Sequence, residues 1–125
     1  MHGPILVIDD EQDIREALVT VLTSEGHDAV AAADGREALR LLREGLRPCL
    51  ILLDLMMPGM NGWEFRIQQR DDPDLAAIPT VVVSAAGMDA IRAVRADAVL
   101  PKPIDVDRLL EILGGYCVER GRALP

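Results

Sequence analysis

Three short runs of apolar residues, without polar residues alternating among them, divide the chain: Ile5–Ile8, Leu50–Leu53 and Thr80–Val83. Runs of this length that are apolar at every position are typical of strands buried on both faces of a parallel sheet. A weaker run at Ala29–Ala32 and a brief one at Ala98–Leu100 add two outer strands. The pattern therefore predicts a sheet of five strands.

The segments between these runs carry apolar residues at three- and four-residue steps, which is the spacing of one helix face. The first such helix places Ile14, Leu18 and Leu22 on one face, and its pattern halts at Gly26. Further helices are predicted from their capping residues and stops: from Asp34 to Gly45, from Asn61 through Gly62 to about Arg70, over Met88–Arg95, and after Asp105.

Strands that alternate with helices specify an α/β fold, because right-handed crossovers place the helices on both faces of a parallel sheet. At 125 residues the chain has the size of one domain, which we expect to span residues 1–118. Residues 119–125 are predicted to form a C-terminal tail, and no output domain is expected in this chain.

Acidic residues outnumber basic ones by 21 to 13, which gives a net charge of -8 and disfavours direct binding to nucleic acid. No apolar segment has the length of a membrane span or the flanks of a signal peptide, so we expect a cytoplasmic protein with no membrane contact. Cys49 and Cys117 lack metal-ligand spacing, and we expect two reduced structural thiols rather than a disulfide.

Polar side chains stand at the carboxyl end of each central strand, where open parallel sheets bind their ligands. Asp9 and Asp10 follow the first strand, Asp54 follows the third, Ser84 the fourth, and Lys102 comes just after the fifth. Taken singly, each is an ordinary turn, cap or surface residue. Together they bring carboxylates close enough to need a compensating cation.

Carboxylate oxygens without nearby His or Cys suit a hard ion such as Mg²⁺. Lys102 adds a fixed positive charge and Ser84 a hydroxyl donor, so the set can neutralise a phosphoryl group in transfer. Asp54 is the candidate nucleophile because it lies centrally, whereas Asp9 and Asp10 form a pair suited to holding the metal.

These residues resemble those of the receiver domains of two-component response regulators, and the resemblance covers about the whole chain. It is carried by four ordered motifs, which are Val7-Ile8-Asp9-Asp10-Glu11, the run from Leu53-Asp54 to Asn61-Gly62, Ser84-Ala85 and Lys102-Pro103.

The resemblance implies the flavodoxin-like strand order 2-1-3-4-5, five helices and a cis peptide bond before Pro103. It implies that Asp54 is the phosphoacceptor, and that Mg²⁺, with Mn²⁺ as an alternative ion, binds Asp9, Asp10, Asp54 and the backbone carbonyl of Met56. Ser84 and Lys102 would engage the phosphoryl oxygens. The implied donor is a histidine kinase or a phosphotransfer protein. The implied output is a changed affinity for a protein partner, with a phosphorylation-dependent homodimer as one form. Such a domain is no enzyme, although it assists its own phosphorylation and dephosphorylation.

The chain departs from the family pattern on the side that usually transmits the signal. Val99 stands where the family usually has Tyr or Phe, and the stretch from Ser84 to Lys102 is shorter by ~4 residues, about one helical turn. We therefore expect a fourth helix that is short or irregular, and an output without an aromatic relay.

Other classes fit less well. Phosphatases of the haloacid dehalogenase class also use an aspartyl nucleophile, but they need a second Asp at the position of Met56. A nucleotide-binding domain would need a glycine-rich loop where Asp9 and Asp10 stand. A receiver-like interaction scaffold that signals without phosphate remains the main alternative, although such a scaffold has no reason to keep all five polar site residues.

Overall fold

The computed structural model describes residues 3–84 and 96–117. In chain order the elements are β1 (Ile5–Ile8), α1 (Gln12–Ser24), β2 (Ala29–Ala32), α2 (Gly35–Arg43), β3 (Leu50–Asp54), α3 (Gly62–Asp71), β4 (Thr80–Ser84), β5 (Ala98–Pro101) and α5 (Val106–Leu113). These bounds follow the predicted ones closely. The fourth helix predicted at Met88–Arg95, with its expected short form, and the tail at 119–125 lie outside the described residues.

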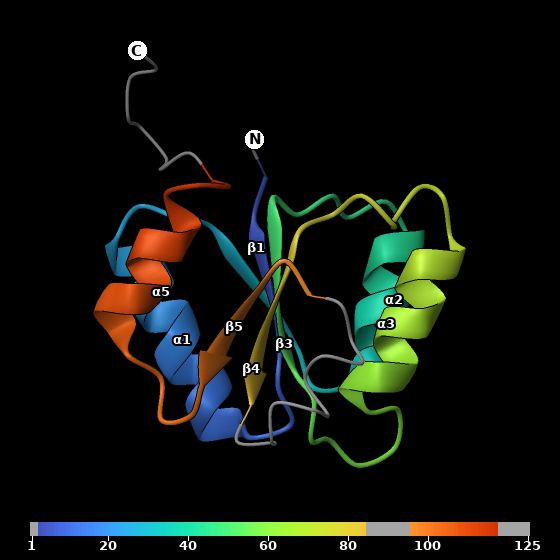
Figure 1. Ribbon diagram of the computed structural model, residues 1–125, viewed down its shortest axis with the longest axis horizontal. Coiled ribbons are helices and arrows are strands. Elements are labelled where there is room, and N and C mark those ends of the chain that lie inside the picture. Colours follow the sequence, from blue (N-terminus) through green and yellow to red (C-terminus); the bar gives the residue numbers. More distant parts are fainter. Residues whose placement is uncertain (1–2, 85–95, 118–125) are drawn as a thin grey trace.

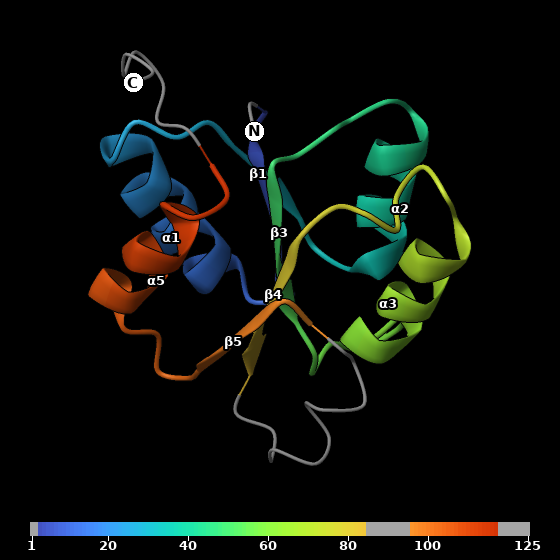
Figure 2. The ribbon, with the colours of Figure 1, turned by 45° about the horizontal axis from the view of Figure 1, so that its top comes forward.

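All strands pair in parallel in one sheet of order β2-β1-β3-β4-β5, which confirms the predicted fold class. Figures 1 and 2 show α1 and α5 on one face of the sheet and α2 and α3 on the other. The order reverses between β1 and β3, so the two first crossovers leave the sheet on opposite faces and open a crevice at their strand ends.

Each face of the sheet has its own core because successive strand residues point to opposite sides. Leu6 and Ile8 of β1 pack with α2 and α3, where Phe65 is fully buried. Ile5 and Val7 pack on the other face with α1 and α5. The uninterrupted apolar runs of the sequence thus serve two cores at once.

The predicted caps form as expected. The side chains of Asp34, Asn61 and Asp105 accept hydrogen bonds from backbone N–H groups in the first turns of α2, α3 and α5. Asn61 also forms a reciprocal capping box with Glu64, which satisfies a further backbone donor. These caps fix where each helix begins relative to the strand before it.

The cysteines correct the sequence prediction, because Cys49 and Cys117 form a disulfide with their Cα atoms 5.6 Å apart. Cys49 directly precedes β3, and Cys117 follows α5 on the same face of the sheet. Their separation of 68 residues gave no local spacing to recognise, and only the packing of α5 on that face brings them together. The bond joins the end of α5 to the start of the central strand.

Candidate metal and phosphoryl site

The predicted polar residues converge at the carboxyl edge of the sheet. Asp9 follows β1, Asp54 is the last residue of β3, Ser84 is the last residue of β4, and Lys102 follows β5. The backbone N–H of Lys102 donates to the carbonyl of Ser84 over 3.2 Å, so these two residues lie side by side at the carboxyl ends of β4 and β5. The peptide bond between Lys102 and Pro103 is cis, as the resemblance implied.

Three carboxylates form a compact group at this edge. Ligand oxygens of Asp9, Asp10 and Asp54 all lie within 4.8 Å of one another. Asp9 and Asp54 are buried, with 2% and 3% of their surfaces exposed, whereas Asp10 is more open to solvent. Burying like charges this closely is unfavourable unless a cation accompanies them.

Lys102 supplies part of that compensation and is the only lysine in the chain. Its ammonium nitrogen lies 3.4 Å from Asp54 Oδ2 and 3.5 Å from Asp9 Oδ2. The ammonium contacts two of the three carboxylates and carries one positive charge, so the group keeps an excess of negative charge.

Burial and the neighbouring charges shift the pKa values of both Asp54 and Lys102 upward. Burial raises the pKa of Asp54 above 3.8, and the neighbouring charge of Asp9 raises it further, although the Met56 N–H and Lys102 act in the opposite sense. Burial works against the charge on Lys102, but the carboxylates of Asp54 and Asp9 outweigh it and raise the pKa of the ammonium above 10.5. The carboxylates therefore add to the effect of burial on the pKa of Asp54 and overcome the opposite effect of burial on the pKa of Lys102.

The loop after β3 is held tightly against Asp54. The N–H of Met56 donates to Asp54 Oδ1 over 3.1 Å, which fixes one carboxylate oxygen. At Gly62 a Cβ would lie 2.7 Å from the Cα of Leu55 and 2.8 Å from the Asp54 carbonyl oxygen, so only glycine allows α3 to start this close to β3. Met56 itself is 61% exposed.

The donor set fits a hard divalent cation. It offers carboxylate oxygens from Asp9, Asp10 and Asp54 and lacks His and Cys ligands. Mg²⁺ binds through one or two carboxylates and keeps waters and phosphate oxygens in its remaining positions. With the cation bound, the excess negative charge of the group would be removed.

Proton and cation therefore compete for Asp54, and we expect the affinity for Mg²⁺ to fall as the pH drops toward the raised pKa of this carboxyl. The sign follows because a metal ligand must be deprotonated, and a raised pKa keeps the proton bound at a higher pH than 3.8. A Mg²⁺ titration of the fluorescence of Trp63, the single tryptophan, at a series of pH values measures this. Asp54→Asn should lose that part of the pH dependence, and an affinity that is flat with pH in the wild type would contradict the prediction.

One contact on this site gave no signal in the sequence. The Nη1 atom of Arg15 in α1 donates to the backbone carbonyl of Asp9 over 2.9 Å. In the sequence this Arg cannot be distinguished from an ordinary solvent-exposed charge on an amphipathic helix, so the residue pattern did not predict the contact.

Comparison with known proteins decides the family. The family model described as "Response regulator receiver domain" matches residues 5–114. This chain is a receiver domain. It is therefore part of a two-component signalling system and belongs to a family of phosphoacceptor switches that interact with histidine kinases and downstream effectors.

Curated relatives of this receiver domain differ in how much of their length they share with it. It is 31% identical to the polar-differentiation response regulator DivK of Brucella anthropi over 120 residues, which is 93% of this chain and 97% of that protein. It is 45% identical to the DNA-binding response regulator MtrA of Mycobacterium tuberculosis over 85 residues, which is 68% of this chain but only 36% of MtrA. The chain therefore spans about a third of the MtrA proteins.

Solved structures of receiver proteins share this fold. A response regulator receiver protein from Pseudomonas putida matches with a TM-score of 0.86 at 31% identity, covering 93% of this chain and 98% of that one. The chemotaxis protein CheY4 of Vibrio cholerae matches with a TM-score of 0.84 at 28% identity, covering 93% and 99%. None of the described helices is long and apolar enough to cross a membrane.

Proposed function

We propose that Asp54 accepts a phosphoryl group from a histidine kinase or phosphotransfer protein in a reaction that requires Mg²⁺. The observation that carries this proposal is the group of carboxylates around Asp54 with Lys102 3.4 Å away. Asp9, Asp10, Asp54 and the carbonyl of Met56 would hold the ion. Mg²⁺, or Mn²⁺ in its place, would supply positive charge to the phosphoryl oxygens.

In the transfer, a carboxylate oxygen of Asp54 forms a bond to phosphorus while the bond to the donor breaks, and the bonding electron pair leaves with the donor imidazole. Lys102 and Ser84 then neutralise and hydrogen-bond the equatorial oxygens, where charge spreads in the transition state. Water later attacks the acyl phosphate and releases inorganic phosphate and the free carboxylate. The domain thus assists both reactions without being a dedicated enzyme.

Phosphorylation would replace the carboxylate of Asp54, with its single negative charge, by an acyl phosphate of charge about -1.5 to -2 with three acceptor oxygens, and this group would draw Ser84 and Lys102 toward it. Because the N–H of Lys102 already bonds to the carbonyl of Ser84, these two residues should move together. Val99 offers no aromatic ring to follow this motion. The switch would therefore act through backbone and packing shifts between two pre-existing arrangements, which change the affinity for a protein partner.

The setting of the domain is part of the proposal. We infer a cytoplasmic receiver unit over residues 1–118, with residues 119–125 outside it. A net charge of -8 argues against direct contact with nucleic acid. A homodimer that forms on phosphorylation would appear as a change in sedimentation after treatment with a phosphodonor.

Intact-mass spectrometry after incubation with phosphoramidate or acetyl phosphate, with and without Mg²⁺, tests the central claim. We expect one phosphoryl adduct that requires both Mg²⁺ and Asp54 and is absent from Asp54→Asn. Phosphoramidate carries no acetyl group, so it separates phosphorylation from acetylation of Lys102, the single lysine. Mg²⁺ binding without an adduct would leave the kinase as the required donor. If the protein shows no Mg²⁺ binding and no adduct, the result would favour the phosphate-independent scaffold.

A further inference from the structure

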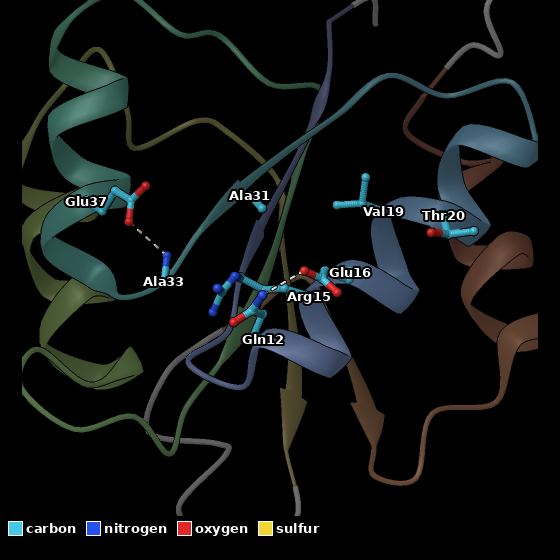
Figure 3. Close-up of a pocket in the computed structure, with 8 residues that line it drawn as sticks. All are labelled: Gln12, Arg15, Glu16, Val19, Thr20, Ala31, Ala33 and Glu37. Atoms are coloured by element: carbon cyan, nitrogen blue, oxygen red, sulfur yellow. Dashed lines mark hydrogen bonds between the residues drawn. The ribbon is translucent and has the colours of Figure 1, made fainter.

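Arg15 makes a contact on the acidic site that its place in the sequence does not explain. It lies in the first part of α1, and its Nη1 atom donates to the carbonyl oxygen of Asp9 over 2.9 Å. Figure 3 shows the side chain leaving α1 and reaching across toward Ala33, the residue that follows β2, rather than outward along the helix. The guanidinium is thus directed at the β1–α1 loop, which carries two of the three site carboxylates.

The contacted carbonyl belongs to the peptide group that joins Asp9 to Asp10. The other polar groups of Asp9 are held as well: its N–H by the carbonyl of Ala32 at 3.2 Å, its Oδ1 by the N–H of Glu11 at 2.9 Å and its Oδ2 by Lys102 at 3.5 Å. The carbonyl oxygen is the remaining polar group of Asp9, and the hydrogen bond from Arg15 fixes it. The plane of this peptide sets the direction in which Asp10 leaves the strand, and Asp10 is the least buried of the three carboxylates.

A role in helix stability does not account for this Arg. The amino-terminal end of a helix disfavours cations, and α1 has no side-chain cap that Arg15 could support. The described residues include no ion pair to Arg15. The Arg15 side chain also lines an open pocket of about 630 Å³, together with residues that include Gln12, Glu16 and Glu37. Water in that pocket screens the charge, whereas the hydrogen bond to the Asp9 carbonyl is directional.

We propose that Arg15 is a positioning residue for the divalent-cation site, holding the Asp9–Asp10 peptide so that both carboxylates face the ion. This inference rests on the proposed function. Two effects oppose each other when Arg15 is removed. Loss of a group that orients metal ligands weakens binding by about 10–100-fold. Loss of a screened positive charge strengthens it by less than about tenfold. The positioning effect is the larger, so the net change is weaker binding.

Titration with MgCl₂, followed by Trp63 fluorescence, tests this in three variants. Arg15→Met removes the donor and the charge, and we expect its dissociation constant for Mg²⁺ to rise about tenfold. Arg15→Lys keeps the charge and one donor, and should recover much of the affinity. Arg36→Met removes an exposed Arg near the start of α2, on the other face of the sheet, and should change the affinity less than about twofold. Unfolding in EDTA should be nearly the same for all three variants as for the wild type.

Equal or tighter Mg²⁺ binding by Arg15→Met would overturn the positioning role, because charge repulsion would then be the main effect of Arg15. Equal losses in Arg15→Met and Arg36→Met would overturn it too. The wild type separates this from the proposed function. If the wild type binds Mg²⁺ and accepts a phosphoryl group while Arg15→Met binds like the wild type, only the Arg15 inference fails. If the wild type does not bind Mg²⁺, both fail.

Discussion

Reduction of the disulfide between Cys49 and Cys117 is expected to lower the free energy of unfolding by about 4 kcal/mol. The bond closes a loop with a sequence separation of 68 residues, and in the chain-entropy account a long loop restricts the unfolded state strongly. The native contacts around it change little, since both sulfurs lie within the core that α1 and α5 share with the sheet. Most of the loss therefore comes from the greater freedom of the unfolded chain.

Urea unfolding with and without a dithiol reductant measures this difference. The variant with Cys49→Ala and Cys117→Ala is the control, and the reductant should leave its transition unchanged. Alkylation of the denatured, non-reduced protein should find no free thiol, and the reduced protein should show two. Two alkylated thiols before reduction, or a transition that ignores the reductant, would contradict the prediction.

The same measurement bears on where the protein works. Reducing compartments such as the cytosol keep most protein thiols reduced. If the proposed cytoplasmic location is right, the stability in the cell is that of the dithiol form, and α5 is held there by packing alone. Trapping thiols at the moment of cell lysis distinguishes the two states.

Replacement of Lys102 by Met should move two properties in opposite directions. The rate of Asp54 phosphorylation by phosphoramidate should fall by about 100-fold or more, because the chain loses the cation that stabilises charge on the transferring group. Mg²⁺ should bind about tenfold more tightly, because the ammonium of Lys102, which lies 3.4 Å from Asp54 and 3.5 Å from Asp9, no longer competes with the ion for these carboxylates. Met keeps the length of the side chain while removing its charge.

Single-turnover phosphorylation at saturating Mg²⁺, together with a fluorescence titration of Trp63, gives both quantities. Arg108→Met serves as the control, since its charge is exposed on α5 and pairs with Glu111 rather than with the site. A loss of rate that higher Mg²⁺ restores would show that Lys102 acts through metal binding. Weaker Mg²⁺ binding in Lys102→Met would show that the ammonium does not compete with the ion.

The sequence by itself determined the fold and the residues gathered at the site. Apolar runs such as Leu50–Leu53 can be buried only as central strands, and Asp34, Asn61 and Asp105 mark where helices begin, so local chemistry was enough for the elements and their order. Parallel strands bring their carboxyl ends to one edge, and this placed Asp54 and Lys102 together although 48 positions separate them in the numbering.

Tertiary structure alone decided the features that depend on how a helix lies against the sheet. The approach of α5 to the start of β3 joins Cys49 to Cys117, and no spacing rule could foresee a pairing over 68 residues. The orientation of α1 relative to β1 brings Arg15 to the carbonyl of Asp9. Side-chain reach and helix orientation are set by the packing of the whole domain rather than by a local motif, so these contacts appear only once the chain is folded.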